Sequence, residues 1–199
     1  MTISAVTICN MALSNIGTRS NIESLDEASA EAAQCKLWYD YARKQSLEAF
    51  DWNFARKRIT LALDSEDADG IDWAYRYQYP ADCLRARRII NPNGYTDDAV
   101  PFDVEISTDG QRKTIVTNLQ DASLIYTFNQ TREDFFEPLF VKALSHLLGS
   151  YVAYPLTTKE QVMSTQYQLY QQMLGFASMT NANEQVSETP RLPDWMRNR

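Results

Sequence analysis

The sequence predicts an α+β fold, in which an antiparallel bundle of about four helices carries an inserted antiparallel β lobe and an extended C-terminal tail. Apolar residues recur with a helical period near both ends of the 199 residues and with a period of two in the middle. Beyond residue 180 the pattern stops, and Pro190 and Pro193 favour an extended chain. We therefore expect residues 1–55 and 132–180 to form the bundle, 56–131 the β lobe and 181–199 the tail.

Two helices are predicted before the β lobe. The first covers residues 3–16, where apolar residues share one face, and Gly17 ends it. The second covers about residues 26–50, and Ser24 or Asp26 can cap its first turn. Its apolar stripe is rich in small residues, which let a neighbouring helix approach closely.

Alternating apolar and polar residues predict β-strands in the middle of the chain. The first strand spans residues 56–63, and an acidic loop at 64–72 follows it. This loop does not fit a calcium-binding EF-hand, because Arg76 falls where a bidentate Glu is required, so we expect a solvated hairpin loop. Further strands are expected at 73–79, 84–90, 102–107, 113–117 and 124–128, with a hairpin turn at 109–110.

Helical patterns return after the lobe. A strongly apolar helix begins at Pro138 and is expected to end at Pro155. Thr157 or Thr158 then caps a last helix that reaches about residue 177. The single histidine, His146, falls in the apolar helix. We expect it to be packed and hydrogen-bonded, because no motif places a nucleophile and an orienting acid beside it.

Composition excludes several classes of protein. Hydrophobic residues make up 44% and charged residues 23%, as in globular domains, so a disordered or collagenous chain is excluded. The three cysteines, Cys9, Cys35 and Cys83, form no CxxC motif, so we expect reduced thiols and no zinc site. No glycine-rich phosphate loop is present, and we assign no catalytic residue, no cofactor and no metal. The first residues lack a basic region followed by an apolar run, so we expect no secretory signal.

The charge of the chain bears on its partners. The net charge of −7 disfavours general electrostatic capture of nucleic acid. Basic residues cluster weakly at 56–58 and 85–88, in a lobe that still has more acids than bases. We expect these clusters to pair with acids of a partner or of neighbouring residues, and a surface that contacts nucleic-acid bases is the weaker alternative.

The last helix has no formally charged residue between Glu160 and Glu184. Its many Gln and Asn side chains exclude a membrane-spanning helix. The side expected to face away from the core carries Gln168, Gln171 and Gln172, together with Gln161, Ser164 and either Tyr167 or Tyr170. Such a face can hydrogen-bond to another protein without desolvating ions, so it is a candidate partner-binding surface. The alternative is a neutral, solvated face.

The C-terminal tail is too short and too rich in proline to pack on itself. It nevertheless carries the apolar residues Leu192, Trp195 and Met196, followed by Arg197. A tail that docks on a partner uses such a Trp as an anchor. We therefore predict that Leu192, Trp195, Met196 and Arg197 bind a partner or a neighbouring copy of the chain.

Segments spread over nearly the whole chain resemble one family. They are ALSNIG (12–17), DEAS (26–29), AR (42–43) and WNFA (52–55), then YQYPADCLR (77–85), FFEPLFVKAL (135–144) and the Gln/Tyr-rich last helix with the ending WMR (195–197). In order and spacing they are similar to the head-to-tail adaptor family of short-tailed bacteriophages, also called tail tubular protein A. Tyr79 departs from this pattern, because Leu is more frequent there before the proline, which affects packing rather than function.

The resemblance implies a structural protein of the virion head–tail junction, assembled in the host cytoplasm. It implies a homo-oligomeric ring of about twelve copies beneath the portal protein, with the tail nozzle protein on the other face. Genomic DNA would pass through the ring without sequence-specific binding, and no membrane is involved. No catalytic, cofactor-binding or metal-binding residues come with the family. The bundle is then expected to make the ring contacts, and the β lobe to face the tail.

Two other functions remain open. A cell-wall hydrolase carried in the tail would use Glu133, Asp134 or Glu137 as acid and base. These residues precede a helix, where acids are expected on electrostatic grounds alone. The other alternative is a minor tail or head-completion protein at a different position in the particle.

Overall fold

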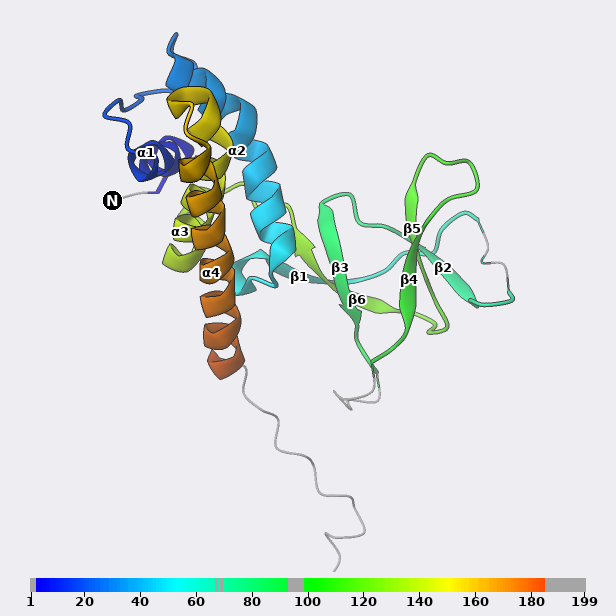
Figure 1. Ribbon diagram of the computed structural model, residues 1–199. Coiled ribbons are helices and arrows are strands. Elements are labelled where there is room, and N and C mark those ends of the chain that lie inside the picture. The colour runs from blue at the N-terminus through cyan, green and yellow to red at the C-terminus, as the bar shows by residue number, and fades with distance from the viewer. Residues whose placement is uncertain (1–2, 67, 69, 93–98, 185–199) are drawn as a thin grey trace, which may run out of the picture.

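The α+β fold predicted from the sequence is confirmed. A computed structural model describes residues 3–66, 68, 70–92 and 99–184 of the chain. A helical bundle formed by both ends of this described part stands beside a β lobe formed by its middle (Figure 1). The expected tail begins beyond the last described residue, except for residues 181–184, which are helical instead.

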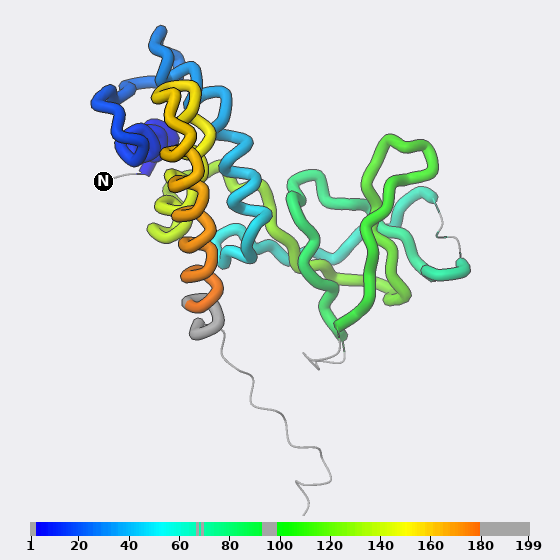
Figure 2. The backbone as a smooth tube through the Cα atoms, viewed as in Figure 1, coloured from blue at the N-terminus to red at the C-terminus, as the bar shows by residue number. Residues whose placement is uncertain are grey.

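The bundle is built around one buried helix. Its described helices are α1 (Ala5–Asn15), α2 (Ala30–Ala49), α3 (Pro138–Thr157) and α4 (Glu160–Glu184). The third helix, α3, packs against each of the other three, and it is buried over most of its circumference. In Figures 1 and 2 the last turns of α4 reach beyond the ends of the other helices. That end of α4 therefore has few neighbours among the described residues.

Capping residues define the end of the first helix and the start of the second. Gly17 ends α1 as predicted, because it adopts φ +79°, the left-handed conformation that glycine tolerates. The second helix begins at Ala30 and not at residue 26, so the prediction that Ser24 or Asp26 caps it is wrong. The cap is Ser29, whose Oγ accepts a hydrogen bond from the Ala32 amide at 3.1 Å.

Pro155 does not end α3, contrary to the prediction. It lies in the last turn of the helix, which continues to Thr157. A proline there removes only one backbone hydrogen bond close to a helix end, where the helix tolerates the loss. Thr158 ends the helix in a left-handed conformation (φ 56°), and its amide donates to the Tyr154 carbonyl at 2.9 Å. The turn to α4 therefore takes place at residues 158–159.

The described residues of the lobe form two antiparallel three-stranded sheets, which confirms the expected β lobe. Sheet A has the order β1-β6-β3 and sheet B the order β2-β5-β4. The sheets enclose a small core that includes Tyr77, Ile115, Leu124 and Tyr126. The strands are β1 (Arg56–Thr60), β2 (Tyr75–Gln78), β3 (Cys83–Ile89), β4 (Phe102–Ile106), β5 (Lys113–Thr117) and β6 (Ser123–Phe128).

Two arginines fasten the lobe to the bundle. Arg43 of α2 is 3% exposed; it donates to Asn129 Oδ1 at 2.8 Å and to the Gln130 carbonyl, just after β6. Arg87 of β3 donates to the carbonyls of Glu48 (3.0 Å) and Phe50 (2.7 Å) at the C-terminus of α2. A cation at this position satisfies carbonyls that the helix leaves without partners. Both chain crossings between bundle and lobe are thus fixed by hydrogen bonds.

No described helix combines the length and the apolar character needed to cross a membrane.

Candidate protein interaction surface

The outward face of α4 is exposed as the sequence predicts. Gln168, Gln171 and Gln172 are all exposed. The opposite side of the helix packs on the bundle through Tyr170 (2% exposed) and Met173. Of the two candidate tyrosines, Tyr167 is therefore the exposed one. We call the exposed residues of α4 between residues 161 and 179 the α4 face.

Large apolar side chains interrupt the glutamines of the α4 face. Tyr167 is 45% exposed, Phe176 56% and Met179 68%. Tyr167 is one of the two tyrosines that the sequence predicts here, whereas Phe176 and Met179 were not among the predicted residues. Both could have been found, because a helical wheel puts Phe176 about 120° and Met179 about 180° around the helix from the buried Tyr170. The α4 face is therefore both uncharged and partly apolar.

Aromatic residues of α2 and α3 extend this surface across the bundle. Trp38 and Tyr151 stack with ring centroids 5.0 Å apart, and Tyr41 lies 5.8 Å from Tyr151. Tyr151 also lies within electrostatic range of Tyr167 on α4. We call Trp38, Tyr41, Tyr151 and Tyr167 the aromatic strip. Tyr41 is 57% exposed, so the strip reaches solvent on α2 as well as on α4.

Tyr151 of the aromatic strip and the buried Tyr170 next to it stay protonated at physiological pH. Burial raises the pKa of Tyr170 to about 12, and it also raises the pKa of Tyr151. Tyr151 donates its hydroxyl to Gln45 Oε1 on α2. The strip is thus a neutral surface with an apolar body and polar tips, a composition that is enriched at protein interfaces.

His146 has a structural role in the core, as expected. It is 8% exposed, and its Nδ1 lies 2.7 Å from Gln166 Oε1. Gln166 Nε2 donates in turn to the Asn15 carbonyl at 2.9 Å. These bonds join α3, α4 and the end of α1, so both side chains are occupied in holding the bundle together.

The acids considered for hydrolysis each have a structural partner. Tyr39 donates its hydroxyl to Glu133 at 3.2 Å, and Arg132 forms an ion pair with Asp134 at 2.7 Å. The carbonyl of Glu137, at the N-cap of α3, accepts from the first turn of that helix. These contacts organise the start of α3.

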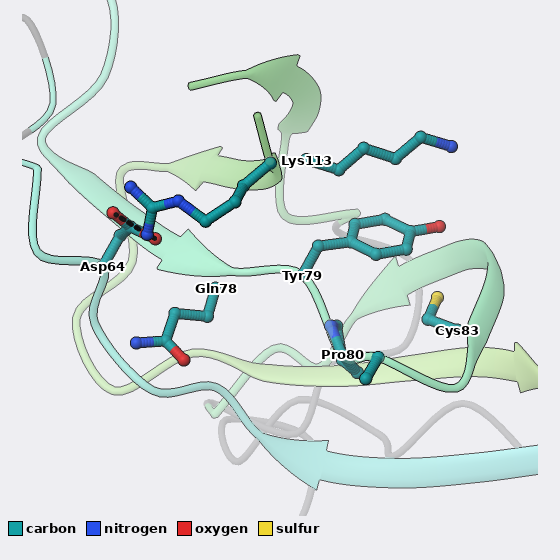
Figure 3. A pocket seen from close by; sticks show the side chains of 8 residues that line it. Asp64, Gln78, Tyr79, Pro80, Cys83 and Lys113 are labelled. Atoms are coloured by element: carbon teal, nitrogen blue, oxygen red, sulfur yellow. Dashed lines mark hydrogen bonds and ion pairs between the residues drawn. The ribbon is translucent and has the colours of Figure 1, made fainter. Parts of the chain in front are cut away.

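An open pocket of about 470 Å³ lies in the β lobe (Figure 3). Arg112 binds Asp64 on one side at 3.3 Å, and Lys113 Nζ lies 5.6 Å from the centre of the Tyr79 ring. Burial raises the pKa of the Cys83 thiol and of the Tyr79 hydroxyl. Neither group is therefore an activated nucleophile at neutral pH.

The cysteines and acids of the described chain do not assemble a metal site. No group of three His, Cys, Asp or Glu residues in this part could hold a metal ion. In the loop 64–72, Asp64 and Glu66 form ion pairs with Arg112. Cys9, Cys35 and Cys83 are free thiols, as expected.

The tail residues Leu192, Trp195, Met196 and Arg197 lie outside the described residues. A scan against protein-family models finds no match to this chain, and a search of curated proteins finds no similar sequence. The function therefore has to be inferred from the α4 face and the aromatic strip.

Proposed function

We propose that this chain is a non-enzymatic connector of a bacteriophage virion, which forms a ring between the portal protein and the tail nozzle protein and conducts genomic DNA. The proposal combines the family resemblance of the sequence with the properties of the bundle surface. Its ring contacts are the α4 face and the aromatic strip.

The observation that carries this proposal is the exposed, uncharged face of α4. Surface helices usually carry Lys and Glu toward water, whereas this helix carries glutamines, Tyr167, Phe176 and Met179. Exposed apolar groups without nearby charges are typical of the core of a protein interface. A ring requires that each copy use two different surfaces, one for each neighbour. The α4 face supplies one of them.

The net charge suits a conduit for DNA. Each copy carries −7, so a ring of about twelve copies would carry roughly −84. A negative channel wall repels phosphates and lets a duplex slide without sticking. A protein that held DNA would instead need a basic surface along the path.

Static light scattering of the purified chain with the portal protein of the same phage tests the proposal. We expect the mass of the complex to exceed that of the portal by about 270 kDa, twelve times the 22.8 kDa of this chain. A mixture whose components keep their separate masses would refute the connector function. Electron microscopy of particles with a labelled chain locates the chain in the virion. A label away from the head–tail junction would assign the chain to another tail or head-completion role.

Removal of residues 190–199 tests the tail separately. We expect the shortened chain to keep its fold, since these residues lie beyond the last described turn of α4. Loss of binding to the portal would support the predicted contacts of Trp195 and its neighbours. Unchanged assembly would refute a role for the tail and leave the α4 face as the proposed contact.

A further inference from the structure

The outer face of sheet A gathers the basic residues that the sequence shows as two weak clusters. Arg58 of β1 lies opposite Ile125 of β6, and Ile125 lies opposite Arg88 of β3. One step along, Arg56 and Arg85 both lie opposite Thr127. Residues directly opposite each other in a sheet point to the same face. The two clusters therefore form one arginine surface across three strands.

Two irregularities in β3 add another arginine to this surface. The register of β3 against β6 shifts between Cys83 and Arg85 and again between Ala86 and Arg88. A bulge places two successive residues opposite one, which breaks the strict alternation of faces. Arg87 consequently joins Arg88 on the outer face, where its Nε donates to Thr127 Oγ1 at 2.8 Å. We call Arg56, Arg58, Arg85, Arg87 and Arg88 the arginine face.

Three of these arginines are occupied by the bundle. Arg56 forms an ion pair with Asp51 at 2.8 Å, and Arg85 donates to the Glu48 carbonyl at 3.1 Å. Arg87 binds the end of α2, as described above. The arginine face therefore begins at the junction with the bundle.

Arg58 and Arg88 are different, because neither forms a hydrogen bond or ion pair within the described part of the chain, and both are exposed. Their Cα atoms lie on the two strands that flank β6, so they are about 10 Å apart. Ile125 between them is only 4% exposed and belongs to neither apolar core. Two guanidinium groups thus point to solvent without a counter-charge.

Charge is separated within the β lobe. The three strands of sheet A contain six basic residues and no acid. The described carboxylates around sheet B include Asp64 and Glu66 in the loop after β1, which pair with Arg112, and Glu105 on β4, which pairs with Arg76. Asp103 on β4 is exposed and forms no ion pair with the described residues. Figure 1 shows sheet A beside the bundle and sheet B on the far side of the lobe. The sheet A side therefore offers unpaired arginines, and the sheet B side offers the exposed carboxylate of Asp103, to a second copy.

We infer that Arg58 and Arg88 bind carboxylates on the sheet B half of the lobe of a second copy of this chain. The inference rests on the proposed ring, because a head-to-tail contact between unlike surfaces is what closes a ring. It adds a second contact in the lobe to the one proposed for the bundle.

Two observations favour a second copy over nucleic acid as the occupant. A duplex-binding protein typically neutralises about six to ten phosphates, whereas on the arginine face only Arg58 and Arg88 lack a hydrogen bond or ion pair with the described residues. The rest of the chain repels phosphates through its net charge of −7, and the same excess of acids supplies the complementary surface in every copy.

Sedimentation velocity of the full chain tests the contact. We expect the wild type to associate at concentrations up to about 0.5 mM and to dissociate at high salt. The double charge reversal R58E/R88E should weaken association roughly tenfold. R19E/K142E, at two exposed bundle residues, adds the same negative charge and should leave association unchanged. R58Q/R88Q should weaken it less, and circular dichroism checks that all variants fold.

Cross-linking identifies the partner residues. The variant R58K/R88K keeps both charges and introduces amines that a carbodiimide joins directly to carboxylates in contact with them. We expect a mixture of ¹⁴N- and ¹⁵N-labelled copies to give cross-linked peptides of mixed isotope, joining residue 58 or 88 to acids of the loop after β1 or of β4. Cross-links within one isotope alone would overturn the inference.

The remaining outcomes are also decisive. A wild type that stays monomeric at all concentrations, or equal weakening by both charge reversals, overturns the contact between copies. Binding of a DNA duplex that R58E/R88E abolishes, with association unchanged, assigns the arginine face to nucleic acid instead. The proposed function has a separate test, the complex with the portal protein. Copies that associate through the arginine face but do not bind a portal would refute the connector function and would leave the contact between copies standing.

Discussion

Replacing the apolar residues of the α4 face should weaken assembly far more than it weakens folding. The double variant Phe176→Ser/Met179→Ser removes two side chains that are 56% and 68% exposed in the single chain. With roughly 200 Å² for each side chain, about 240 Å² of apolar surface is available to a partner. At about 25 cal/mol per Å², its burial contributes about 6 kcal/mol before any cost of association.

Only part of this free energy appears as affinity, because ordering of side chains and imperfect packing offset it. If about half remains, the double variant loses about 3 kcal/mol, or roughly 100-fold in the dissociation constant. The assay is light scattering over a range of concentrations, with the chain alone and with the portal. Met11→Ser is the matched control, since Met11 is an exposed methionine on α1, away from the α4 face.

The reasoning would be refuted by a double variant that assembles as the wild type does. It would also be refuted if Met11→Ser weakened assembly equally, because the effect would then not belong to the α4 face. The midpoint of urea unfolding provides the check on folding, and we expect it to change little for either variant, because the replaced side chains are more than one-third exposed.

Further predictions concern the junction and its ion pairs. Arg43→Ala should lower the free energy of unfolding by roughly 3–5 kcal/mol, since Asn129 and the buried Gln130 carbonyl lose their donor. Arg43 also donates to Asp40, which forms an exposed ion pair with Lys44. Lys44→Ala should therefore cost under about 1 kcal/mol, and urea unfolding that ranks the two variants equally contradicts this. The hydrogen bonds from Lys44 and Arg43 lower the pKa of Asp40 in the folded chain. The Asp40 carboxylate therefore stabilises the fold above pH 3.8, and this stabilisation is lost as the pH falls through the lower pKa of the folded state. Asp40→Asn should flatten this part of the curve of stability against pH, and an unchanged curve would count against the prediction. Arg87→Met should destabilise the last turn of α2 by about 1–2 kcal/mol, because the carbonyls of Glu48 and Phe50 lose their donor. Hydrogen exchange at the amides of that turn should then be faster. Exchange as slow as in the wild type would show that these carbonyls need no cap.

Local patterns predicted the elements well where one face of an element is buried. The hairpin of β4 and β5 follows from alternation around a Gly that adopts φ +71°, and both helix pairs follow from apolar periodicity. Errors occurred where two local signals competed. Ser24, Asp26 and Ser29 are all acceptable caps by residue type, and the helix uses Ser29.

The candidate surfaces were predicted in part. The exposure of Gln168, Gln171 and Gln172 follows from helical period and composition. The aromatic strip was missed because Trp38 and Tyr41 lie off the apolar stripe of α2 and meet Tyr151 only after the bundle has formed. The arginine face depends on strand register and on two bulges in β3, and neither is determined by residues that are neighbours in sequence.

The two arginine-bound crossings between bundle and lobe have a mechanical consequence. Force applied to the lobe reaches α2 and the segment before α3 through short hydrogen bonds rather than through a slack linker. A tilt of the lobe must therefore bend the end of α2 or break the bonds of Arg43 and Arg87. Strain at one end of the molecule is thus passed on to the other end with little loss.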